Sequence, residues 1–151
     1  TARPPAEAAT GSGAGKPPGH RFVGFRLLVA DDMRVNRVLC QDLVLRLGAT
    51  ADLAENGREA LAAFRATDYD LVLMDCRMPG IDGYEATREI REWEGRTGAG
   101  RVPIVALTDH DTNSTREACL EAGMDDLLAK PCRLEQLRAM LDRWLPAAPR
   151  A

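Results

Sequence analysis

Short apolar runs alternate with amphipathic stretches along the chain from about Arg26 onward. The apolar runs hold four to six residues, which suits strands buried on both faces of a sheet. Between them, apolar residues such as Val35, Val38 and Leu43 recur at helical spacing, which is typical of a helix with one buried face. The pattern predicts strands at 27–30, 50–54, 70–75, 102–107 and 126–129, and helices at 35–47, 57–66, around 86–93, 112–122 and 133–145.

The predicted elements form five successive strand–helix units. Strict alternation of this kind predicts an α/β fold, with a parallel sheet, helices on both of its faces and right-handed crossovers. The stretch 95–101 contains three glycines, and we expect it to be the loop before the fourth strand.

The first 21 residues differ from the rest, because they hold four Pro and four Gly and no Val, Ile, Leu, Phe or Trp. Such a segment cannot bury enough apolar surface to offset its ordering entropy. We therefore expect a flexible linker or tail at 1–25, one globular domain at 26–146 and a C-terminal tail at 147–151. Phe22 and Phe25 are the first side chains able to pack on a fold. A linker here suggests that residues 1–21 continue from a larger protein, and a disordered end is the alternative.

Composition narrows the classes of function. The net charge of −3 and the pI near 5.4 argue against direct binding to nucleic acid or to an anionic membrane surface. No apolar run approaches the roughly 20 residues of a membrane helix, and no secretory signal opens the chain. The four cysteines include no CxxC pair, so we expect reduced thiols in a cytoplasmic setting.

Polar residues follow most of the predicted strands. Asp31 and Asp32 come after the first, Asp75 ends the third, Thr108 follows the fourth and Lys130 the fifth. The carboxyl ends of parallel strands share one edge of the sheet, so we expect these side chains to converge there. Clustered carboxylates repel one another and call for a cation, and hard oxygen ligands suit Mg²⁺. A hydroxyl and an ammonium beside the metal would complete a phosphoryl site, with a carboxylate as nucleophile.

Five segments of the sequence resemble the receiver domains of two-component signalling. They cover nearly everything outside the linker and read VADDMRVNR (29–37), LAENGREAL (53–61), YDLVLMDCRMPGIDGYEATREIR (69–91), PIVALT (103–108) and AGMDDLLAKP (122–131). The resemblance implies a flavodoxin-like doubly wound sandwich with strand order 2-1-3-4-5. The segments look most like the receivers of hybrid sensor histidine kinases.

The resemblance also implies a role for each site residue. Asp75 would accept the phosphoryl group, and Thr108 and Lys130 would contact its oxygens. Mg²⁺ would be held by Asp31, Asp32, Asp75 and the backbone carbonyl of Arg77. The bond between Lys130 and Pro131 would be cis.

In this interpretation the domain takes a phosphoryl group from a phosphohistidine on a histidine kinase or a histidine phosphotransfer domain. It assists its own phosphorylation and dephosphorylation, and the switch changes its contacts with partners. We expect a monomer that is the C-terminal receiver of a hybrid kinase, which itself can be attached to a membrane. Exposed residues of the first helix, such as Arg34, Arg37 and Gln41, are the expected partner face.

Two positions depart from the family pattern. Leu127 stands where many receivers carry a switching Tyr or Phe, and Asp109 follows Thr108 where a small residue is usual. An acid beside an anionic phosphoryl group repels it unless it is paired, and we hypothesise an ion pair between Asp109 and Arg77.

Other functions stay open from the sequence. One is a stand-alone single-domain response regulator. Another is a Mg²⁺-dependent phosphohydrolase with an aspartate nucleophile, although such enzymes favour D-x-D after the first strand. A third is a receiver fold that acts without phosphorylation, whose usual signature is the loss of an acid or of the lysine.

Overall fold

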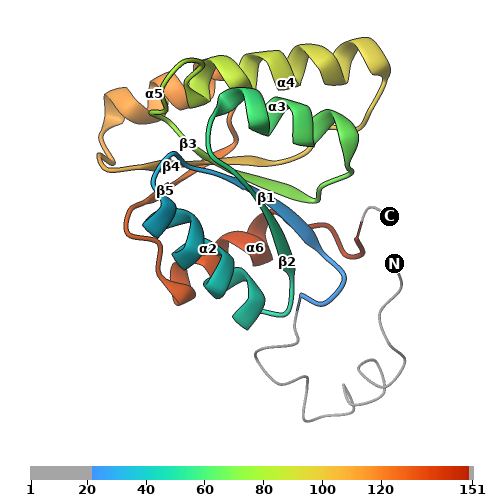
Figure 1. Ribbon diagram of the computed structural model, residues 1–151, viewed down its shortest axis with the longest axis vertical. Helices are drawn as coiled ribbons and strands as arrows, with labels where there is room; N and C mark the ends of the chain where they lie inside the picture. Colours follow the sequence, from blue (N-terminus) through green and yellow to red (C-terminus); the bar gives the residue numbers. More distant parts are fainter. Residues whose placement is uncertain (1–21, 150–151) are drawn as a thin grey trace.

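The computed structural model describes residues 22–149 (Figure 1). Its ten elements alternate between strand and helix. In chain order they are β1 (Arg26–Ala30), α2 (Arg34–Arg46), β2 (Thr50–Ala54), α3 (Gly57–Ala66), β3 (Leu71–Asp75), α4 (Gly83–Thr97), β4 (Ile104–Thr108), α5 (Asn113–Ala122), β5 (Asp126–Ala129) and α6 (Leu134–Trp144).

The strands form one parallel sheet in the order β2-β1-β3-β4-β5, which confirms the predicted topology. β1 and β3 lie side by side near the centre, with Leu28 opposite Val72 and Ala30 opposite Met74. Because the strands run the same way, the residues after β1, β3, β4 and β5 lie along one edge of the sheet.

Helices cover both faces of the sheet, as Figure 1 shows. Successive strand residues point to opposite faces. Leu27 and Val29 pack in the core that α2 and α6 close, whereas Leu28 and Ala30 pack in the core under α3, α4 and α5. These strand residues are fully buried, so burial of apolar surface on both faces stabilises the sheet.

The folded region begins before the predicted boundary at residue 26. Phe22 and Phe25 are 5% and 2% exposed, and the amide of Phe22 donates to the carbonyl of Leu47 over 3.0 Å. Both rings lie in the core beside α2, so they belong to the domain and not to the linker. Residues 1–21 of the linker or tail predicted at 1–25 lie outside the described residues.

Two details of the predicted helices are wrong. α4 continues to Thr97, where a loop was expected, and ends on Gly98 in the left-handed conformation at φ 74°. Contacts of Glu94 and Thr97 hold this last turn, although glycines surround it. In α2, Val35 and Val38 were expected on the buried face, yet they are 73% and 51% exposed.

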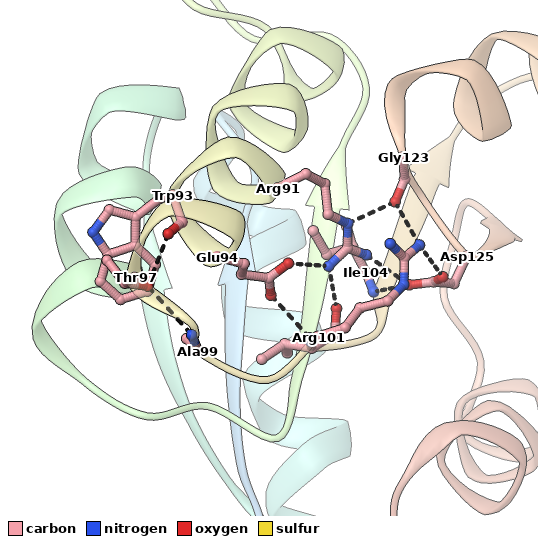
Figure 2. Close-up of polar contacts among 10 residues, drawn as sticks. Arg91, Trp93, Glu94, Thr97, Ala99, Arg101, Ile104, Gly123 and Asp125 are labelled. Atoms are coloured by element: carbon pink, nitrogen blue, oxygen red, sulfur yellow. Dashed lines mark hydrogen bonds and ion pairs between the residues drawn. The ribbon is translucent and has the colours of Figure 1, made fainter.

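An ion network around the half-buried Arg91 fastens α4 to the starts of β4 and β5 (Figure 2). The guanidinium of Arg91 donates to the carboxylates of Glu94 and Asp125 and to the carbonyls of Val102 and Gly123, over 2.7–2.9 Å. Glu94 also accepts from the amide of Val102, and Asp125 accepts from the amide of Ile104 and from Arg101. Each charge therefore has several partners, which is the condition for burying it.

All four cysteines are free thiols, as expected. Within residues 22–149, none of the helices combines the length and the hydropathy needed to cross a bilayer.

Candidate functional site

Three carboxylates from two strand ends meet at the carboxyl edge of the sheet. Asp31 and Asp32 follow β1, Asp75 ends β3, and one oxygen from each lies within 4.8 Å of the others. Asp31 is fully buried and Asp75 is 3% exposed, while Asp32 faces solvent. The predicted convergence of these acids is therefore present.

Asp31 is held from several directions. Its amide donates to the carbonyl of Ala54, and its Oδ1 accepts from the amide of Met33 over 2.9 Å and from Asn36 over 3.4 Å. Its Oδ2 is buried and has no hydrogen-bond partner, although the ammonium of Lys130 lies 3.4 Å away. A buried carboxylate oxygen without a donor is rare, because it has lost its hydration without replacement.

Lys130 joins the acids from the end of β5. Its Nζ donates to Oδ1 of Asp75 over 3.0 Å. Burial by itself would lower the pKa of Lys130, but the hydrogen bond to Asp75 and the charges of Asp75, Asp31 and Asp109 raise it. Lys130 is therefore a fixed positive charge at the site.

Burial and the neighbouring charge of Asp31 raise the pKa of Asp75 from 3.8 to about 6, against the opposing effect of Lys130. The single ammonium does not balance the crowded acids. A divalent cation would do so, and the donor set of hard carboxylate oxygens with an unpartnered Oδ2 of Asp31 fits Mg²⁺.

Thr108 and Arg77 line a small hollow beside Asp75, together with Asp109 and His110. The amide of Arg77 donates to Oδ1 of Asp75 over 3.2 Å. The hydroxyl of Thr108 accepts from the amide of His110 over 3.1 Å, so it is engaged with its own loop. A wider cavity of about 390 Å³ opens between Asp32 and the loop after β3.

The hypothesised ion pair between Arg77 and Asp109 is wrong. Both side chains are exposed at the rim of the hollow, and among the described residues no ion pair joins them. Asp109 instead lies close enough to Lys130 to influence its pKa. The half-buried ammonium of Lys130 is screened by solvent less than the exposed guanidinium of Arg77, so its attraction for Asp109 is weakened less.

The bond between Lys130 and Pro131 is cis, as the resemblance implied. Leu127 is 6% exposed and packs in the core with Ala106 and Cys119. Leucine has neither a hydroxyl nor an aromatic ring, so position 127 cannot switch by moving such a group between the core and the surface.

The sequence did not reveal the close packing that fixes the loop after β3. A Cβ on Gly83 would overlap the carbonyl oxygen of Asp75, and one on Gly57 would overlap that of Ile81. The amide of Gly83 also donates to the carbonyl of Cys76 over 3.1 Å. The motif MPGIDG is visible in the sequence. The backbone segment that packs against each glycine is known only from the fold.

The family model for the response regulator receiver domain matches residues 27–142. The sensor histidine kinase GacS of Pseudomonas protegens is 41% identical over 119 residues, a match that covers 79% of this chain and 13% of the kinase. The chain thus spans a small part of the curated relatives it matches.

Two solved structures extend the likeness. The receiver domain of the sensor histidine kinase PA1611 from Pseudomonas aeruginosa, crystallised with a magnesium ion in its active-site cleft, is 42% identical with a TM-score of 0.72 over 81% of this chain and 98% of that one. The receiver domain of Ssk1 from Saccharomyces cerevisiae was solved with the histidine phosphotransfer protein Ypd1. It is 28% identical with a TM-score of 0.77, over 82% of this chain and 90% of that one. Fold, site and sequence agree, and the chain belongs to the response regulator receiver domain family.

Proposed function

We propose that Asp75 accepts a phosphoryl group from a phosphohistidine, as one step of a phosphorelay. The observation that supports this most is the placement of Asp75 between two further acids and the ammonium of Lys130, at 3.0 Å. A carboxylate is a weak nucleophile and needs neighbours that stabilise the charge of the incoming group.

Asp31, Asp32, Asp75 and the backbone carbonyl of Arg77 would hold Mg²⁺. The bound ion would neutralise negative charge on the phosphoryl oxygens. The receiver domains of PA1611 and of CKI1 from Arabidopsis thaliana were both crystallised with magnesium, which supports the same cofactor here.

Asp75, Lys130 and Thr108 each have a separate role in the transfer of the phosphoryl group. A bond forms between an oxygen of Asp75 and phosphorus as the phosphorus–nitrogen bond of the donor breaks, and the electron pair leaves with the imidazole. Lys130 offers a phosphoryl oxygen an ammonium that is already held in place. Thr108 reaches the same group only after its hydroxyl leaves the amide of His110, so that exchange couples phosphorylation to the loop after β4.

The partner is a histidine kinase or a histidine phosphotransfer domain. The expected partner face needs correction, because Arg37 and Gln41 are half-buried and donate to the carbonyls of Asp31 and Ala51. Exposed apolar side chains lie instead at the start of α2, the helix that follows Asp31 and Asp32, on Met33, Val35 and Val38 at 51–73% exposure. Such side chains at the start of α2 suit an apolar partner surface next to the phosphoryl group.

The relatives GacS and BvgS are sensor proteins of which this chain spans 12–13%, and they support a place for this domain in a longer sensor kinase. A stand-alone response regulator remains the alternative. The phosphohydrolase is not favoured, because both the family and the order of the acids argue for a receiver.

Intact mass spectrometry after incubation with acetyl phosphate and Mg²⁺ tests the proposal. We expect the mass of one phosphoryl group on the wild type, and none on Asp75→Asn or after chelation of the metal. Asp70→Asn is not a suitable control because Asp70 is buried, whereas Asp68→Asn changes an exposed acid before the same strand and should label normally. Labelling that persists in Asp75→Asn would contradict the assignment.

A further inference from the structure

We propose that Arg37 is a positioning residue for the metal site, because it fixes the peptide that joins Asp31 to Asp32. This inference rests on the proposed function. Arg37 lies in the first turns of α2, and its NH1 donates to the backbone carbonyl of Asp31 over 2.8 Å. The contact joins a helix side chain to the backbone between the two acids.

This hydrogen bond completes the restraint of Asp31. The amide, Oδ1 and the carbonyl each have a partner, and those partners come from β2, from the start of α2 and from Arg37. Only Oδ2 has no hydrogen-bond partner, and it lies 3.4 Å from the ammonium of Lys130. The residue therefore presents one oxygen to the site, in one direction.

The carbonyl of Asp31 and the amide of Asp32 belong to one planar peptide unit. β1 ends at Ala30, so the sheet does not supply a donor for this carbonyl. Asp31 is fully buried, so water does not readily reach its carbonyl. If the guanidinium of Arg37 is removed, this carbonyl loses a hydrogen bond that water does not readily replace. The peptide would then turn toward another donor and carry both acids with it.

The charge of Arg37 works against a purely electrostatic explanation. A cation near the start of a helix opposes the helix dipole, and a cation near three carboxylates disfavours the approach of a second cation. α2 nevertheless has no acid in its first turn and carries arginines there. By charge alone, removing Arg37 would strengthen Mg²⁺ binding, whereas loss of its hydrogen bond would weaken it.

Arg34 provides a matched control. It lies one turn earlier on the same helix and carries the same charge, but its side chain is exposed, and its guanidinium makes no hydrogen bond or ion pair with any described residue. Comparing substitutions of Arg37 and Arg34 therefore separates the effect of charge on Mg²⁺ binding from the effect of the hydrogen bond to Asp31.

The experiment is calorimetric titration of the full chain with Mg²⁺, without a phosphodonor, on the wild type, Arg37→Met, Arg37→Lys and Arg34→Met. We expect Kd to rise on the order of 10-fold in Arg37→Met, as for other residues that orient metal ligands. Arg37→Lys, which keeps a donor and the charge, should recover part of the affinity. Arg34→Met should bind as tightly as the wild type or more tightly.

An Arg37→Met variant with the Kd of the wild type, or one weakened no more than Arg34→Met, would overturn the inference. If Arg37→Met does not fold, Arg37→Gln replaces it with the same expected weakening, and an unchanged Kd there overturns the inference equally. Failure of the wild type to bind Mg²⁺ would contradict the proposed function as well. Normal binding in the Arg37 variants, with labelling of Asp75 intact, would contradict only the role of Arg37.

Discussion

Substitution of Arg91 by Met tests how the edge of the sheet remote from the acids is held together. Arg91 is 14% exposed and donates to two carboxylates and two carbonyls (Figure 2). Methionine keeps much of the apolar length of the side chain, so the change removes the guanidinium with little loss of packing.

The expected loss in free energy of unfolding depends on the two carboxylates that remain in Arg91→Met. Glu94 and Asp125 are 6% and 11% exposed and would lose their shared cation, although Val102, Ile104 and Arg101 still donate to them. Breaking a buried pair by removing one partner costs about 3–5 kcal/mol. Because backbone donors and Arg101 remain, we expect about 3 kcal/mol, at the lower end of that range.

Urea denaturation followed by circular dichroism measures this loss. Arg46→Met is the control, because Arg46 pairs with Asp42 on the surface at 65% and 54% exposure, and loss of such a pair costs less than about 1 kcal/mol. If Arg91→Met loses no more free energy of unfolding than Arg46→Met, the network does not stabilise the fold and the reasoning fails.

Two further predictions concern the site. Asp75→Asn should stabilise the metal-free protein by about 1–3 kcal/mol at pH 7, because the pKa of Asp75 is about 6 in the fold against 3.8 unfolded. The folded state therefore binds the proton more tightly, the wild type loses stability as the pH rises from about 4 to 6, and a gain that persists at pH 3 would contradict this origin. Gly83→Ala should cost about 1–3 kcal/mol, because its Cβ would meet the backbone of Asp75, whereas Gly95→Ala in the same helix meets nothing within 4 Å and should stabilise by up to about 1 kcal/mol. Equal melting temperatures for the two alanine variants would contradict the second prediction.

The sheet was predictable because its strands are short, apolar and separated by helical patterns, so one topology satisfies both faces. The meeting of Asp31, Asp75 and Lys130 followed from that topology, since parallel strands end at one edge. The assignment of a role to each residue depended on the resemblance, which supplied Asp75 as the phosphoacceptor, the backbone carbonyl of Arg77 as a metal ligand and the cis bond.

Other features depended on tertiary contacts that no local pattern encodes. The last turn of α4 forms because Glu94 is held by Arg91 and Val102, despite the glycines around it. Val35 and Val38 have the spacing of a helix face but lie on the outside, because the face of α2 turned to the core is the one that carries Cys40, Leu43 and Val44. The bond between Arg37 and Asp31 links residues from a helix and a strand end, so it is visible only in the fold.

The central claim is that Asp75 becomes an acyl phosphate, and reductive trapping tests it most directly. Borohydride converts an aspartyl phosphate to homoserine, and mass spectrometry of the resulting peptides locates the change. After incubation with Mg²⁺ and acetyl phosphate, the account predicts homoserine at position 75 and unaltered Asp31 and Asp32. Homoserine at another aspartate, with Asp75 unmodified, would contradict it.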